Sequence, residues 1–162
     1  MLVSQVVSPQ GPPIGFPAPS ATAIALGVAC RAAHAASVLR KQLRFGPAIA
    51  PVGRVLSLDH ATTSQLFDYF EQCFIATVFS IQALEAYCNY KISQGLHTDY
   101  KVERRGKTIF LSPAEAEREL SIDEKLGALL PELLNVPTPR GRKEWEAYVN
   151  IRRIRDATIH LN

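Results

Sequence analysis

The sequence predicts an all-α protein: a bundle of four helices, or up to five, with a small hairpin or loop inserted before the third. Two observations carry this prediction. Apolar residues recur at steps of three and four in the long segments, which is the spacing of one helix face. Capping serines, glycines and prolines separate those segments, as they do where helices begin and end.

Composition points to an ordinary globular domain. The chain has 162 residues, of which 47% are hydrophobic and 20% charged, and this length is enough for one core. The net charge of +3 permits nucleic-acid binding without requiring it. Basic residues nevertheless gather near the end of the sequence: Arg140, Arg142, Lys143, Arg152, Arg153 and Arg155.

The cysteines indicate the compartment. Cys30, Cys73 and Cys88 form an odd set without CxxC spacing, which favours free thiols over a zinc site. No apolar run reaches the roughly 18 residues of a membrane span, and the start of the chain lacks the basic residues of a secretory signal. We therefore expect a cytoplasmic protein with no membrane contact, no metal and no cofactor.

The chain divides into an arm and a single domain. Residues 1–19 are rich in proline and glycine, so we expect an extended or disordered arm, and residues 20–162 form the helical domain. Ser20 is a suitable N-cap for a first helix that runs to about Phe45. Residues 46–61 contain further prolines and are predicted to be a loop.

The second helix, 63–93, is the most hydrophobic element and is predicted to lie at the centre of the bundle. One apolar row consists of Leu66, Phe70, Cys73, Thr77, Ile81, Leu84, Cys88 and Ile92, and a second consists of Phe67, Phe74 and Val78. Glu85 continues the second row, so we expect it to be partly buried and paired with Arg155 or Arg152. The alternative is that Glu85 faces water near the helix end.

An insert precedes the third helix. Residues 100–111 alternate loosely and predict a hairpin that turns at Arg105 and Gly106, with a short irregular loop as the alternative. Ser112 and Glu115 then form a capping box at the start of a short helix.

A second capping box begins at Ser121 and predicts a helix over 122–134, which Pro131 should kink or interrupt. The buried face of that helix is predicted from five leucines: Leu126, Leu129, Leu130, Leu133 and Leu134.

The last segment, 145–162, is predicted to be an amphipathic helix. The face expected to pack on the second helix consists of Ala147, Ile151, Ile154, Thr158 and Leu161. Arg153, Asp156 and His160 follow the same spacing on another face, with Arg155 between the rows. A basic group, an acid and an imidazole thus meet within about two turns. The alternative is a solvated helix end on which Asp156 and His160 form an ordinary ion pair.

Arg155, Asp156 and His160 form an Arg-x4-His motif that resembles the signature of the HEPN superfamily. Two further features are similar to the layout of that family: segment 80–87, and segment 123–126 followed by a loop and Trp145. The resemblance covers roughly residues 20–162 and implies a four- or five-helix bundle of HEPN type. Members usually continue the helix beyond the motif, whereas only two residues follow His160 here, so we expect this turn to fray unless a second chain holds it.

The resemblance also implies a chemistry, that of a metal-independent endoribonuclease. His160 would take the proton from the ribose 2′-OH, Arg155 would stabilise the charge on phosphorus and Asp156 would orient them. Arg152, Arg153 and Glu85 would support the site. The products would be a 2′,3′-cyclic phosphate and a 5′-OH, and the site would be composite at the twofold axis of a homodimer.

The implied partners are a second copy, an RNA substrate and, in a toxin–antitoxin or defence setting, a nucleotidyltransferase-like antitoxin. Two alternatives stay open at this point. One is a non-catalytic HEPN-like binding or scaffold module, and the other is a helical interaction protein whose last helix is basic for reasons unrelated to RNA.

Overall fold

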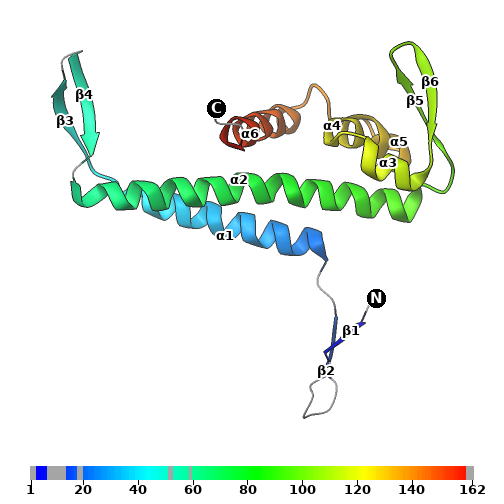
Figure 1. Cartoon of the computed structure of the whole chain (residues 1–162), viewed down its shortest axis with the longest axis horizontal. Helices are drawn as coiled ribbons and strands as arrows, with labels where there is room; N and C mark the ends of the chain where they lie inside the picture. Colours follow the sequence, from blue (N-terminus) through cyan, green and yellow to red (C-terminus); the bar gives the residue numbers. More distant parts are fainter. Residues whose placement is uncertain (1–2, 7–13, 18–19, 51–52, 59, 160–162) are drawn as a thin grey trace.

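A computed structural model shows a mostly helical, elongated chain, which confirms the predicted helical class (Figure 1). The structure describes residues 3–6, 14–17, 20–50, 53–58 and 60–159.

Two long helices, α1 (Ala21–Gln42) and α2 (His60–Gly95), lie side by side along the molecule. Ser20 caps α1 as predicted, because its hydroxyl accepts a hydrogen bond of 3.1 Å from the amide of Ala23. The residues of α1 that are buried against α2 are all alanines: Ala25, Ala29, Ala32 and Ala36. Small side chains at this spacing let the two helices pack closely.

The segment between the two helices differs from the prediction. The first helix ends at Gln42, and a hairpin of β3 (Phe45–Ala50) and β4 (Gly53–Leu58) replaces the expected loop. Proline is tolerated in such a two-stranded ribbon because neither strand needs every amide for pairing. A second ribbon, β1 (Val3–Val6) with β2 (Ile14–Pro17), lies in the N-terminal arm and stands away from the helices (Figure 1).

Among the described residues, α1 is the one helix long and apolar enough to cross a membrane by length and composition. No such segment was predicted from the sequence. Core helices and signal sequences meet the same criteria of length and composition. The feature therefore carries no assignment by itself.

The predicted insert is a hairpin. Strands β5 (Tyr100–Arg104) and β6 (Lys107–Leu111) pair antiparallel, with Tyr100 opposite Leu111. Arg105 and Gly106 have φ values of 52° and 73°, so both turn residues are left-handed. This is the two-residue turn whose twist matches paired strands, and glycine at its second position relieves the strain.

The third helical region is broken, as predicted. It consists of α3 (Pro113–Glu119), α4 (Ile122–Glu124), a π-helical turn η1 (Lys125–Leu129) and α5 (Leu130–Leu133). Both predicted capping boxes are present. Pro131 has no amide to offer to the carbonyl of Gly127, which instead accepts a hydrogen bond of 2.8 Å from the hydroxyl of Thr138. The π turn thus accommodates the proline.

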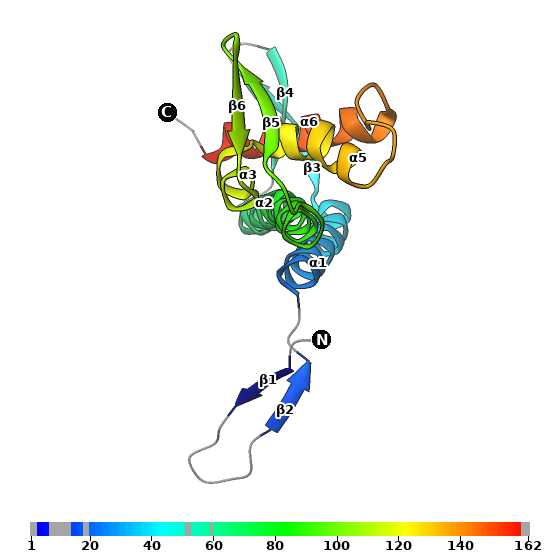
Figure 2. The same ribbon diagram turned by 90° about the vertical axis from the view of Figure 1, so that its right-hand side faces the viewer.

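The hydrophobic core lies at one end of α2. It contains Cys88, Ile92, Leu111, Ala116, Leu120, Leu129 and Leu130. Figure 2 shows the arrangement that creates it: α1 lies on one side of α2, and the elements from β5 to α6 lie on the other. Of the five leucines predicted to be buried, Leu129 and Leu130 are buried, Leu126 and Leu133 are half-buried, and Leu134 is exposed.

The first half of α2 is not covered in this way. Phe67, Phe70 and Phe74 are 67%, 55% and 41% exposed, so the prediction that both apolar rows are buried along the whole helix is wrong. The rows were identified correctly as helix faces, but the chain supplies a cover for only part of them.

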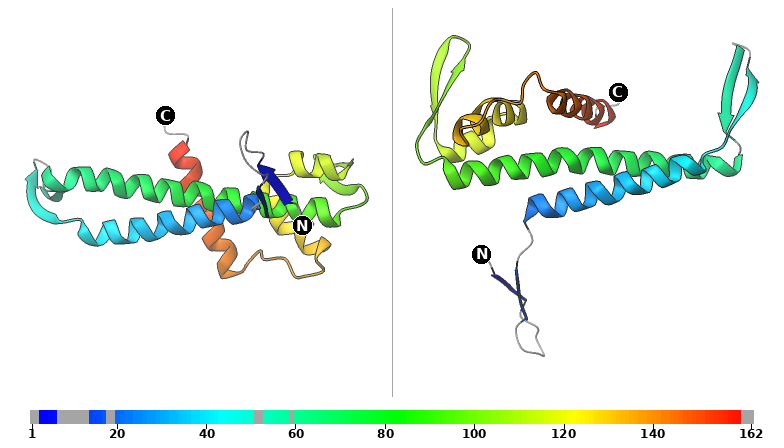
Figure 3. Two further views of the ribbon diagram at one scale, coloured as in Figure 1. Left: turned by 90° about the horizontal axis from the view of Figure 1, so that it is seen from below. Right: turned by 180° about the vertical axis from the view of Figure 1, so that it is seen from behind.

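The last helix, α6 (Lys143–Ile159), crosses α2 (Figure 3), which confirms the predicted contact between these two helices. The predicted contact face is wrong. Ile151 and Ile154 are 38% and 57% exposed, whereas Tyr148 is buried. Ala147 and Thr158 of the predicted face are also exposed, and Leu161 lies outside the described residues.

Candidate functional site

Asp123 anchors α6 to the start of α4. Its carboxylate accepts a short hydrogen bond from the phenol of Tyr148. The same carboxylate forms an ion pair with Arg152, in which Nη1 of Arg152 lies 2.8 Å from Oδ2. Burial, and then the neighbouring Asp123 carboxylate, raise the pKa of the Tyr148 phenol above its usual value. Two side chains one turn apart on α6 are therefore held by one acid.

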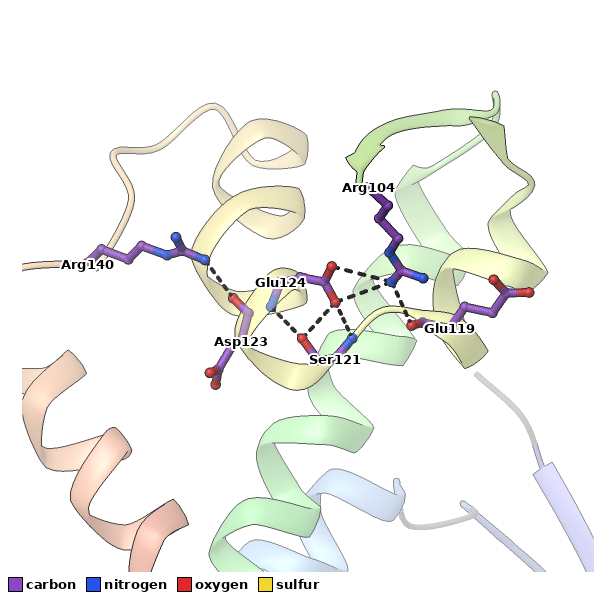
Figure 4. A network of polar contacts seen from close by, with 6 residues as sticks. All are labelled: Arg104, Glu119, Ser121, Asp123, Glu124 and Arg140. Carbon is purple, nitrogen blue, oxygen red and sulfur yellow. Dashed lines mark hydrogen bonds and ion pairs between the residues drawn. The ribbon is translucent and has the colours of Figure 1, made fainter. Parts of the chain in front are cut away.

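The turn that carries Asp123 is clamped from two sides (Figure 4). Arg104 donates hydrogen bonds to the carbonyl of Glu119, at 3.0 Å, and to the carboxylate of Glu124, at 3.3 Å. Arg140 donates a hydrogen bond of 3.5 Å to the carbonyl of Asp123. Burial acts to raise the pKa of Glu124, but hydrogen bonds from Ser121 and the charge of Arg104 outweigh it and hold that pKa below its usual value. The position of Asp123 is thus set by a charged network.

Arg155 and Asp156 of the motif lie together. Nε of Arg155 is 3.0 Å from Oδ1 of Asp156, a distance within ion-pair range. The same Nε is buried and has no hydrogen-bond partner among the described residues, so the contact is close but poorly aligned. Nε of Arg152 is also buried without a hydrogen-bond partner among the described residues, although Nη1 of the same side chain pairs with Asp123.

The other two candidate residues of the last helical segment are His160 and Arg153. His160 lies outside the described residues, so its approach to Arg155 stays a prediction. Arg153 is exposed on the outer side of α6, beside a shallow hollow lined by Trp145, Glu146, Val149 and Asn150. Arg153 therefore does not share a face with Arg152 and Arg155.

The expected burial and pairing of Glu85 are wrong. Glu85 is exposed, Arg152 pairs with Asp123, and Arg155 lies against Asp156 of its own helix. The alternative, in which Glu85 faces water, is the one the structure shows. The physical reason is that each arginine has a nearer carboxylate, Asp123 at 2.8 Å from Arg152 and Asp156 at 3.0 Å from Arg155.

One buried lysine was not predicted from the sequence. Lys125 is 1% exposed, and its Nζ donates to Oδ1 of Asn89 at 2.9 Å and to the carbonyl of Glu117 at 2.5 Å. Next to it, burial raises the pKa of the Cys88 thiol to about 11, against the opposing charge of Lys125. A lysine among leucines normally indicates an exposed position, so the sequence held no signal for this burial.

Asp123 and Tyr148 were also missed as site residues. In the sequence, Asp123 is recognisable only as an acid in the first turn of a capped helix. Tyr148 is recognisable only as an aromatic residue in an amphipathic helix. Within the part of the chain that the structure describes, no group of three or more His, Cys, Asp or Glu side chains is placed to hold a metal ion.

Comparison with known proteins adds no assignment. No family model, curated protein or solved structure matches the chain.

Proposed function

We propose that the chain is a metal-independent endoribonuclease of HEPN type, with a site that two copies of the chain complete. The observation that carries the proposal is the state of Arg155. It lies at the end of α6 beside Asp156, it is uncommitted to any other element among the described residues, and it has a buried, unpartnered Nε–H. The Arg155 side chain is still 29% exposed, so the other N–H groups of its guanidinium are free to donate to a phosphate oxygen.

In the proposed reaction His160 accepts the proton of a ribose 2′-OH, and the 2′ oxygen forms a bond to the adjacent phosphorus. The bond from phosphorus to the 5′ oxygen breaks, and that oxygen takes a proton from water and leaves as a 5′-OH. A 2′,3′-cyclic phosphate remains on the other fragment. Arg155 stabilises the charge that develops on the phosphoryl oxygens, and Asp156, at 3.0 Å, orients the guanidinium.

The geometry of one helix argues for two copies. Residues five positions apart on an α-helix are about 140° apart around its axis. Arg155 and His160 of one chain therefore point in different directions and cannot both contact a single phosphate well. A twofold-related chain can supply the second of the two side chains.

The supporting residues take revised roles in this proposal. Arg152 is neutralised by Asp123 and holds α6 in place, so it acts on the site through position. Arg153 faces outward, away from Arg155, and does not meet the same phosphate. Glu85 is exposed and has no part in the site.

The second candidate function is a non-catalytic HEPN-like binding or scaffold module. The close contact between Arg155 and Asp156 favours it, because a partly neutralised guanidinium is a weaker phosphate ligand. In that case the partner would be a protein, such as a nucleotidyltransferase-like antitoxin.

The two functions separate in an RNA cleavage assay on the full chain, run with and without EDTA. The nuclease proposal expects cleavage that EDTA leaves unchanged and that both Arg155→Ala and His160→Ala abolish. Arg118→Ala, which removes an exposed arginine of α3, is the matched control and should keep full activity. Equal cleavage by the wild type and by both motif variants would refute the proposal, and absence of cleavage in folded wild type would favour the scaffold.

A further inference from the structure

One apolar stripe runs along α2 and is only half covered. Six side chains fall within a narrow sector of the helix: Phe67, Phe70, Phe74, Ile81, Cys88 and Ile92. The last three are at most 3% exposed, and the first three are at least 41% exposed. The same face of one helix is therefore core at one end and solvent-facing at the other.

The uncovered part lies on the side of α2 away from α1. On that side α6 crosses α2 at about its middle, and no described helix lies between α6 and the β3–β4 hairpin (Figure 1). Three phenylalanines at these exposures present about 300 Å² of aromatic surface, since each ring can bury roughly 200 Å². Contiguous apolar patches of this size on a monomer are often functional.

The surface of the whole chain leads to the same conclusion. Its accessible area is 11887 Å² for 17.8 kDa. A compact monomer of this mass exposes about 8,000 Å². The excess belongs partly to the projecting hairpins. An obligate homodimer buries roughly 2,000–5,000 Å² in total, about half of it on each chain, so association with a second chain would cover part of the excess.

The chain itself carries a surface that fits the stripe. On α6, Ile151 and Ile154 face outward between Arg155 on one side and Arg153 on the other. The exposed acids Glu71 and Asp68 lie on one side of the phenylalanines of α2, about 40° and 100° round the helix from Phe67. One surface is apolar with cations beside it, and the other is apolar with anions beside it, so the two are complementary.

We propose that a second copy of this chain covers the first half of the α2 stripe, with its Ile151 and Ile154 seated on Phe67, Phe70 and Phe74. Twofold symmetry makes the contact reciprocal, because each copy offers both surfaces. Arg153 of each copy then lies near Asp68 or Glu71 of the other. The inference deepens the two-copy site and rests on that proposal for any link with RNA, but the docking itself is measured without RNA.

Sedimentation velocity of the full chain between about 1 and 100 µM tests the docking. The wild type should sediment as a dimer, and Phe70→Asp, Phe74→Asp and Ile154→Asp should each sediment as monomers with unchanged helical circular dichroism. Phe110→Asp is the matched control, because Phe110 of β6 is also exposed, at 63%, but lies outside the proposed contact. It should leave the dimer intact.

A charge exchange tests the orientation of the contact. Glu71→Arg and Arg153→Glu should each weaken dimerisation about threefold to tenfold, and the double variant should recover most of that loss. If recovery is absent for Glu71 and also for Asp68→Arg, the proposed orientation is wrong. A monomeric wild type over the whole range, or a dimer that survives all three Asp variants, would overturn the docking.

The same preparations separate this inference from the proposed function. A dimer that depends on Phe70 but does not cleave RNA supports the docking and refutes the ribonuclease. Cleavage by a variant that sediments as a monomer refutes the role of the docking in the site while leaving the motif chemistry in place.

Discussion

The two halves of α2 have nearly the same kind of apolar face and opposite surroundings. Around Cys88 and Ile92, the face is closed by β6, α3, η1 and α5, and its side chains are fully buried. Around Phe70, a larger side chain on the same face is 55% exposed. The difference teaches that hydrophobic periodicity identifies a face to be covered and does not say which chain provides the cover.

The largest expected contrast comes from truncating one side chain in each half. Ile92→Ala should lower the free energy of unfolding by about 2–5 kcal/mol, because it leaves a cavity in a closed core. Phe70→Ala should change it by less than about 0.5 kcal/mol in the monomer, because the ring is already solvated. Urea unfolding, at protein concentrations below the dimer dissociation constant, measures both changes. Equal losses of stability would show that the two halves are packed alike.

A smaller effect concerns the buried lysine in the closed half. Lys125→Met keeps most of the volume but leaves Oδ1 of Asn89 and the carbonyl of Glu117 without their donor. Each of the two buried acceptors without a partner costs about 1–3 kcal/mol, but removing the buried ammonium offsets part of this sum, so the variant should be less stable by about 1–3 kcal/mol in all. Adding Asn89→Leu should recover part of the loss. A Lys125→Met variant as stable as wild type would show that the lysine is not needed there.

The smallest effect is the pH dependence of the clamp on the α4 turn. The pKa of Glu124 is lowered in the folded chain, so its contribution is fully present above the unfolded value of about 4.3 and is lost as the pH falls through the folded value. Ser121→Ala should cost about 1 kcal/mol at pH 7, because it removes the cap.

Thermal unfolding at pH 7 and pH 3 checks this, with Glu124→Gln alongside. The stability gap between wild type and Glu124→Gln should shrink at pH 3. A gap that stays constant would mean that the charge of Glu124 contributes nothing.

Local features of the fold were predictable from the sequence because their causes are local. The caps at Ser20, Ser112 and Ser121 and the turn at Arg105 and Gly106 depend on residues within a few positions of each other. The hairpin in place of the 46–61 loop was not predictable, since the prolines that suggested a loop are also tolerated in an isolated ribbon.

The candidate site was predictable as a set of residue types and not as a set of contacts. Arg155 and Asp156 are neighbours in sequence, and the structure brings their side chains together. The pairing of Arg152 with Asp123 joins positions far apart in the chain, and nothing in the spacing of either segment distinguishes Asp123 from Glu85 as the acid. The choice of contact face on α6 follows from that pair, which turns Ile151 outward.

Amide hydrogen exchange along α2, measured at two protein concentrations, tests most directly whether the chain covers one half of this helix and a second copy covers the other. Amides around residues 84–95 should be equally protected at both concentrations, whereas those around 64–76 should gain protection as the concentration rises above the dimer dissociation constant. Strong, concentration-independent protection of 64–76, or a gain confined to 84–95, would contradict the division of α2 into a self-covered half and a partner-covered half.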